Sequence, residues 1–63
     1  MKPEELKIGL EVGYDCIPAL MSYRGKIVSI GAEPNGADCK IAWNHRQHLG
    51  ASSECAQSLR KWD

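Results

Sequence analysis

The 63-residue chain has no phenylalanine, and its only aromatic residues are two tyrosines and two tryptophans. Its three cysteines are an odd number without a CxxC pair, which argues against a disulfide scaffold. No apolar run approaches the roughly 20 residues that a membrane-spanning helix requires. Eight basic and eight acidic residues cancel, so no overall field attracts the chain to nucleic acid or to an anionic membrane.

What is present indicates a small folded protein. Hydrophobic residues make up 43% and charged residues 25% of the chain, a globular composition. A chain of this length allows one domain, residues 1–63, and lies near the lower limit for a self-sufficient core. Because disulfides and metals are not indicated, oligomerisation is the remaining source of extra stability. No signal segment is recognisable, so we expect a cytoplasmic protein.

Alternating apolar residues predict three strands. Residues 10–17 place Leu10, Val12, Tyr14 and Cys16 on one face, and Pro18 ends the strand. Residues 25–31 are rich in β-branched side chains, but Ile27 and Ile30 cannot share a face without a bulge, so we expect that one apolar side chain is exposed or that the strand is kinked. A turn at residues 33–36 then leads into residues 38–44, with Cys39, Ile41 and Trp43 on one face.

The two ends of the chain are less regular. Pro3, Glu4 and Glu5 suit one short helical turn. Residues 51–62 allow two interpretations. In the first they form a helix capped by Ser53. In the second they form a fourth strand over 51–55, a 3₁₀ turn at Gln57 and Ser58 and a fifth strand over 59–62. We favour the second, because the preceding three strands need a closing partner.

The predicted fold class is therefore all-β: a small five-stranded SH3-like barrel with a short N-terminal helical turn and a 3₁₀ turn near the C-terminus. The order of an Ile8-Gly9-x-x-Val12 stretch, a long first loop, a Gly25-Lys26-Ile27-Val28 strand, a tight hairpin and an Ala56-x-x-Leu59-Arg60-Lys61-Trp62 ending resembles SH3-like small barrels. These include KOW, Tudor-like and YodC-type domains and, more distantly, type II dihydrofolate reductases.

The resemblance implies different functions in different branches. Tudor-type domains hold methylated side chains in a cage of three or four aromatics, and Tyr14 and Trp43 are expected to point inward, which leaves too few. The reductases line their pore with a Val-Gln-Ile-Tyr stretch, where this chain reads Ser52-Ser53-Glu54-Cys55. KOW-like domains contact RNA or protein through loops, which this sequence permits.

The first loop is unusually apolar for a surface connection. Its large side chains are Ile17, Leu20, Met21 and Tyr23. They predict one of two roles: a lid over the core, or a contact surface for a protein partner or a second copy of the chain. The main functional hypothesis is a non-enzymatic interaction module that binds through this loop.

An alternative hypothesis is nucleic-acid binding. In this hypothesis a local surface contacts phosphates through its cations and stacks an aromatic ring on bases. The surface would be formed by Lys40, His45, Arg46, Lys61 and Trp62. A third hypothesis is an oligomeric enzyme whose site lies between subunits, which single-chain motifs cannot reveal.

Other chemistry is not indicated. His45 and His48 with Cys39 and Cys55 lack the spacing of a zinc site, so we expect no metal or cofactor. No serine or cysteine has a recognisable nucleophilic setting, so no catalytic residue is assigned. The three thiols, Cys16, Cys39 and Cys55, are expected to be buried, reduced and slow to react.

Overall fold

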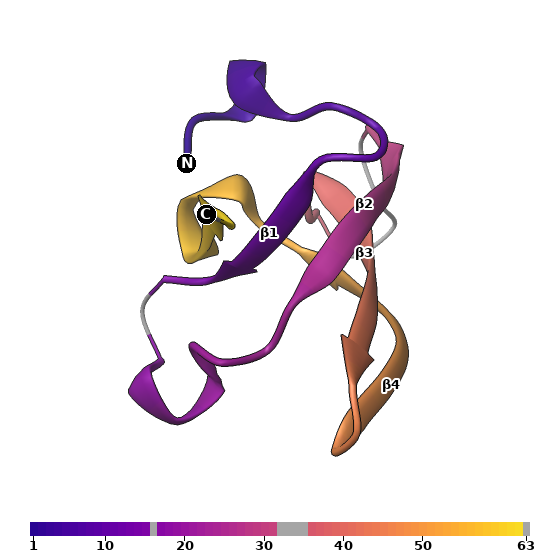
Figure 1. Cartoon of the computed structure of the whole chain (residues 1–63). Helices are drawn as coiled ribbons and strands as arrows, with labels where there is room; N and C mark the ends of the chain where they lie inside the picture. Colours follow the sequence, from indigo (N-terminus) through magenta and orange to yellow (C-terminus); the bar gives the residue numbers. More distant parts are fainter. Residues whose placement is uncertain (16, 32–35, 63) are drawn as a thin grey trace.

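The computed structural model describes residues 1–15, 17–31 and 36–62. Five antiparallel strands form one sheet in the order β4 (His48–Glu54), β3 (Cys39–His45), β2 (Gly25–Ile30), β1 (Glu11–Tyr14) and β5 (Leu59–Lys61) (Figure 1). In the described ranges, three single 3₁₀ turns connect or precede them: η1 (Pro3–Glu5), η2 (Pro18–Leu20) and η3 (Ala56–Ser58). The predicted all-β class, the five strands and both terminal turns are confirmed.

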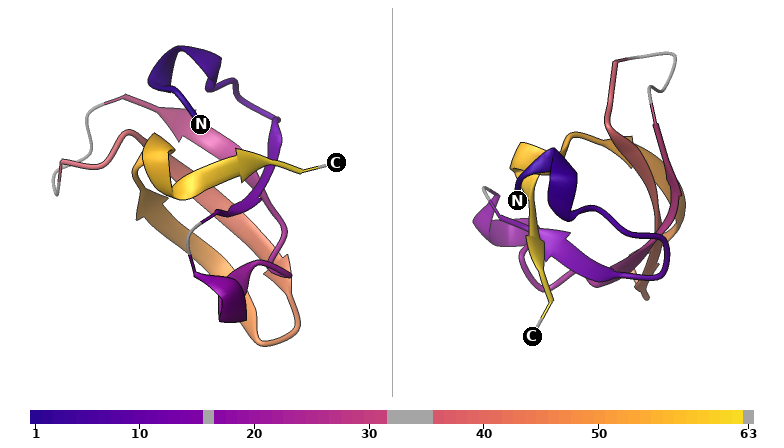
Figure 2. Two further views of the ribbon diagram at one scale, coloured as in Figure 1. Left: turned by 90° about the vertical axis from the view of Figure 1, so that its left-hand side faces the viewer. Right: turned by 90° about the horizontal axis from the view of Figure 1, so that it is seen from above.

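The sheet is strongly curled, as the view from above shows (Figure 2). After η3 the chain returns to the first strand, so that β5 pairs with β1 from Val12↔Lys61 to Tyr14↔Leu59. Within the described residues, β4 and β5 are the two edges of the sheet and do not pair with each other. A continuous ring of strand pairs is therefore not formed there.

The core occupies the concave side of this curl. The alternation predicted for residues 38–44 is confirmed, because Cys39, Ile41 and Trp43 are all buried. Val12 and Tyr14 from β1 are also buried, and Leu10 packs against the core from just before β1. The rest of the buried cluster comes from β2, β5 and the terminal turns, and consists of Leu6, Ile27, Ala56 and Leu59.

The second strand contains a register shift between Ile27 and Ser29, which is the irregularity that the two isoleucines need to share a face. Ile27 is fully buried, whereas Val28 and Ile30 are each 45% exposed. The extra residue brings Ile30 opposite the buried Cys39, in the same phase as the Ile27↔Ile41 pair, and Ile30 is still partly exposed because it is the last residue of β2. Of the turn predicted over 33–36, residues 33–35 lie outside the described residues.

Two strand boundaries differ from the prediction by about three residues. The first strand ends at Tyr14 rather than near residue 17, and the backbone bends at Asp15, whose N–H donates to the Ser58 carbonyl at 2.9 Å. The fourth strand begins at His48 rather than 51, because it continues the β3 ladder up to a tight turn closed by the His45↔His48 pair. The helical interpretation of residues 51–62 is wrong, since only η3 is helical there.

The cysteines are not equally protected. Cys39 is fully buried and its thiol lies 3.5 Å from the Glu54 carbonyl oxygen. Cys55 is only half-buried, so the prediction that its thiol is buried is wrong. Cys55 is the N-cap residue of η3 and lies after the end of β4, where the inward and outward alternation of the strand no longer applies. Cys16 lies outside the described residues.

Candidate functional site

The last aromatic residue, Trp62, lies on the convex face of the sheet beside β1. Its backbone N–H donates to the Glu11 carbonyl at 3.0 Å, which continues the β1–β5 pairing by one residue. Gly13 leaves room for the indole: a Cβ at Gly13 would stand 2.9 Å from Trp62 Cε3, closer than real contacts allow. The missing side chain at Gly13 therefore creates the seat for Trp62.

Two arginines lie on either side of this seat. Arg60 is the β5 partner of Gly13, and Arg24 immediately precedes Gly25, which pairs with Val12 on the other side of β1. Their guanidinium carbons lie 5.2 Å (Arg60) and 5.8 Å (Arg24) from the Trp62 ring centroid, within cation–π range. Arg60 of β5 and Arg24, just before β2, therefore place two cations beside one half-buried indole.

Arg24 also forms an ion pair with Glu11, using its Nε and Nη2 groups. This pair stands between two open hollows on the surface. One hollow, of about 490 Å³, is lined by Gly9, Leu10, Glu11, Arg24 and Trp62. The other, of about 300 Å³, is lined by Glu11, Arg24, Gly25, Lys26, Ala42 and Asn44. We call these two adjoining hollows, with Arg60, the Trp62 surface.

Arg60 connects the Trp62 surface to the first loop. Its Nη2 donates to the Met21 carbonyl at 3.3 Å. In the described part of the chain, its Nε is the one buried side-chain nitrogen or oxygen without a hydrogen-bond partner. This side chain is held between the loop and the indole.

A second aromatic cluster is formed by side chains from β1, β3, β4 and the end of the first loop. Tyr14 and Trp43 stack with ring centroids 4.5 Å apart, and Tyr23 stacks on His45 at 4.3 Å and on His48 at 5.3 Å. These rings are mostly packed against one another, and Tyr14 and Trp43 are buried. The cluster therefore serves packing rather than forming an open cage.

A hydrogen-bonded chain links this cluster to β4. The Trp43 indole donates to Ser52 Oγ at 2.8 Å, and the Ser52 hydroxyl donates to Glu54 Oε2 at 2.8 Å. The Tyr14 hydroxyl donates to the same carboxylate oxygen at 2.6 Å. Burial, followed by the hydrogen bond to Glu54, raises the pKa of Tyr14 to about 12.

The structure divides the four first-loop residues into two pairs. Leu20 is half-buried and packs against the core, and Tyr23 is half-buried in the aromatic cluster. Ile17 and Met21 are 44% and 37% exposed. The loop therefore covers the core with one pair and presents the other to the surface.

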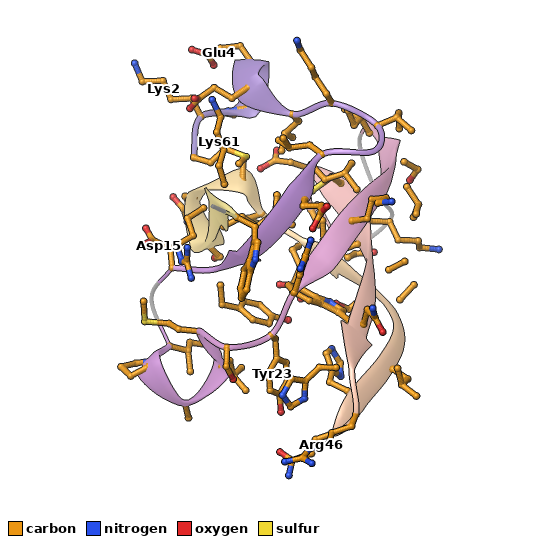
Figure 3. The ribbon with its side chains drawn as sticks, viewed as in Figure 1. Lys2, Glu4, Asp15, Tyr23, Arg46 and Lys61 are labelled. Carbon is orange, nitrogen blue, oxygen red and sulfur yellow. The ribbon has the colours of Figure 1, made fainter. Side chains whose placement is uncertain are left out.

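The five residues of the nucleic-acid hypothesis are not brought together. Arg46 and Lys61 lie at opposite ends of the molecule (Figure 3). Lys61 is 3.1 Å from Glu5 in an ion pair, and Lys40 is exposed opposite Ser29 and Ser53. His45 is stacked on Tyr23. Only Trp62 belongs to the Trp62 surface.

Sequence reasoning missed Arg24, Arg60 and Glu11. The available signal was glycine within a predicted strand, because Gly13 interrupts the 10–17 alternation and such a gap marks the close approach of another group. Finding which group approaches it required the β1–β5 register, which depends on where the last strand returns.

Among the described residues, no group of three or more histidine, cysteine, aspartate or glutamate side chains is placed to hold a metal ion. His45 and His48 close one end of the β3–β4 hairpin, whereas Cys39 pairs with Glu54 at the other end. In the same part of the chain, no helix is long and apolar enough to cross a bilayer. Comparisons with protein-family models, curated proteins and solved structures find no match.

Proposed function

We propose that this chain is a non-enzymatic interaction module that binds an extended, acidic segment of a protein partner on the Trp62 surface. The observation that carries the proposal is the pair of adjoining hollows that share Glu11 and Arg24, one of them lined by Trp62. Adjoining hollows suit an extended chain, which presents successive side chains along its length.

The chemistry of the lining selects the ligand class. Arg24, Lys26 and Arg60 outnumber Glu11, so the surface attracts carboxylates. Glu11 stands at the boundary of the two hollows, where it would repel a phosphodiester but can accept a hydrogen bond from a peptide N–H. Zero net charge further disfavours a polyphosphate ligand. Trp62 and Leu10 supply an apolar contact for one ligand side chain.

The test starts with selection from a displayed library of random peptides, followed by titration of a selected peptide into ¹⁵N-labelled protein. We expect the indole N–H resonance of Trp62 to shift. The Trp43 indole N–H, which donates to Ser52 inside the protein, should not move and serves as an internal control. Trp62→Ala and Arg24→Ala should each weaken binding at least tenfold, about 1.4 kcal/mol.

Arg46→Ala is the matched control, because it removes an exposed arginine that lines neither hollow and should leave binding unchanged. Labelled single-stranded RNA and DNA are titrated in parallel. Tighter binding of either nucleic acid than of the peptides, with a steep salt dependence that Arg24→Ala reduces, would replace the proposal by the nucleic-acid alternative.

The first loop is a second candidate surface for a protein partner. Ile17 and Met21 remain exposed beside Pro18 and Ala19, so the loop presents a small apolar patch. If selected peptides shift the amides of residues 17–21 and leave the Trp62 indole unchanged, this patch is the binding site instead.

We also propose that the fold is a barrel of the SH3-like kind. The support is the curled five-stranded sheet in which a 3₁₀ turn precedes the last strand and directs it back to β1. The odd number of cysteines, without a CxxC pair, supports a reducing, cytoplasmic location.

A further inference from the structure

The edge strand β4 has one side without a partner strand in the described part of the chain. The Asn44 N–H donates to the Arg24 carbonyl at 2.8 Å, so the backbone groups of Asn44 face β2. The backbone N–H and C=O groups of successive strand residues point to opposite sides of the strand. The backbone groups of Trp43 therefore face β4, where Trp43 pairs with Gly50. By the same alternation, the N–H and C=O groups of Leu49, Ala51 and Ser53 point away from the sheet.

Residues 49–53 of this edge lack two of the usual protections against strand addition. Edge strands are commonly blocked by charged side chains or proline, and residues 49–53 read Leu-Gly-Ala-Ser-Ser. Leu49 is 71% exposed, more than any other large hydrophobic residue described. The opposite edge, β5, has only three residues and carries Arg60 and Lys61. The two edges therefore differ in whether they resist pairing.

We infer that β4 is a self-association surface, which pairs antiparallel with β4 of a second copy about a two-fold axis at Ala51. In this register Ala51 faces Ala51 of the second copy, and Leu49 faces Ser53. Every outward donor of one copy then meets an outward acceptor of the other, as an antiparallel ladder requires. The two sheets join into one continuous sheet.

The segment is suited to its own copy for two reasons. An isologous contact places like residues near the axis, where like charges would repel, and residues 49–53 have no charge. At the ends of the paired segment, His48 of one copy faces Glu54 of the other, a pair able to hydrogen-bond. Small Ala51 side chains at the axis allow close approach on the convex face.

This inference is independent of the proposed function. The Trp62 surface is built on residues of β1, β2, β3 and the end of β5, whereas the self-association edge is the outer side of β4, which contributes no residue to either hollow. A monomeric protein could still bind peptides, and a dimer could fail to do so. Peptide titration and mass measurement therefore distinguish the two failures.

The test measures the solution mass by sedimentation between about 10 µM and 1 mM, the range of moderate to weak affinities. The wild-type chain should reach twice the mass of one chain. Ala51→Lys and Ala51→Glu should each remain single chains, because each would place like charges opposite one another. A mixture of the two variants should regain the double mass, because opposite charges then face each other at the axis.

Ala51→Gln is the matched control, since it enlarges the same exposed side chain without charge and should retain association. Amide exchange gives a second readout. Protection of Leu49, Ala51 and Ser53 should rise with protein concentration, while that of Gly50 and Ser52, which already pair with β3, should not change. A wild type that stays a single chain, or an Ala51→Lys variant that still dimerises, overturns the inference.

Discussion

The convex and concave faces of the sheet each depend on a glycine that lies against a tryptophan. A Cβ at Gly13 would stand 2.9 Å from Trp62 Cε3, at the surface. A Cβ at Gly25 would stand 2.5 Å from Ile41 Cγ2 and 2.8 Å from Trp43 Cε3, in the core. The same substitution at the two positions therefore separates the effect on the site from the effect on the fold.

Gly25→Ala should lower the free energy of unfolding by about 1–3 kcal/mol, because the core cannot yield easily to an added methyl group. Gly13→Ala should cost less, because the half-buried Trp62 indole can shift outward. The indole N–H resonance of Trp62 should move in Gly13→Ala and that of Trp43 in Gly25→Ala. Equal losses of stability in both variants would contradict this assignment.

The two described thiols provide a second comparison at the level of single residues. Cys39 is fully buried in β3, whereas Cys55 caps η3 and is half-buried. A thiol reagent under native conditions should therefore modify Cys55 faster than Cys39, which reacts only when the structure opens. Mass spectrometry of the labelled peptides measures both rates. Equal rates, or faster labelling of Cys39, would mean that β3 opens more readily than its packing indicates.

At the scale of elements, the first loop combines two roles in adjacent residues. Leu20 packs against the core and Met21 is exposed, although its carbonyl accepts a hydrogen bond from Arg60. Leu20→Asp should lower the thermal midpoint by several degrees, because a carboxylate would have to be placed at the core boundary. Met21→Asp should leave the midpoint nearly unchanged, because its side chain already contacts solvent.

Thermal denaturation followed by circular dichroism measures both variants. If Met21→Asp lowers the midpoint as much as Leu20→Asp does, the exposed half of the loop is also part of the packing. Sedimentation of Met21→Asp adds a check on association. A dimer lost in Met21→Asp but kept in Ala51→Lys would assign self-association to the loop instead of β4.

The sequence was most informative where side chains alternate between core and solvent. Cys39, Ile41 and Trp43 could be placed on the inner face from spacing alone, because one buried face fixes the phase of a strand. The same rule indicated a kinked strand or an exposed apolar side chain near Ile27 and Ile30, and the structure has both a register shift after Ile27 and a partly exposed Ile30. The start of β4 at His48 could not be predicted, because Leu49, Gly50 and Ala51 have no apolar alternation and form a strand only by pairing with β3.

The Trp62 surface could not be predicted, for a different physical reason. Its residues come from three segments that are distant in sequence, represented by Glu11, Arg24 and Trp62. Their proximity depends on the return of β5 to β1, which is a long-range pairing. Local spacing instead suggested Arg46 and Lys61, which are close to other polar residues in sequence but lie at opposite ends of the fold.

At the scale of the whole molecule, two groups link stability to pH at opposite ends of the scale. The backbone N–H of Lys2, which donates to Glu5 Oε1 at 2.9 Å, and then Lys61 hold the pKa of Glu5 below its ordinary 4.5. Glu5 therefore stabilises the fold above pH 4.5, and this contribution is lost as the pH falls through its lowered pKa. Because Glu5 is at the surface, its effect is small and screened by salt.

Tyr14 determines the alkaline end. Its pKa is raised from 10.0 to about 12, so the folded protein retains a proton that the unfolded chain releases. The stability that Tyr14 contributes is complete below pH 10 and is lost as the pH rises to about 12.

Denaturant midpoints of the wild type should therefore fall between pH 10 and about pH 12, and those of Tyr14→Phe should fall less. At neutral pH, Tyr14→Phe should be less stable by about 1–2 kcal/mol, because it loses a hydrogen bond to a carboxylate. All other groups are common to both proteins, so the difference between the two profiles isolates Tyr14. Parallel profiles would show that its hydroxyl is not held by Glu54 in solution, and the polar link from β1 to β4 would then contribute nothing to the stability of the folded sheet.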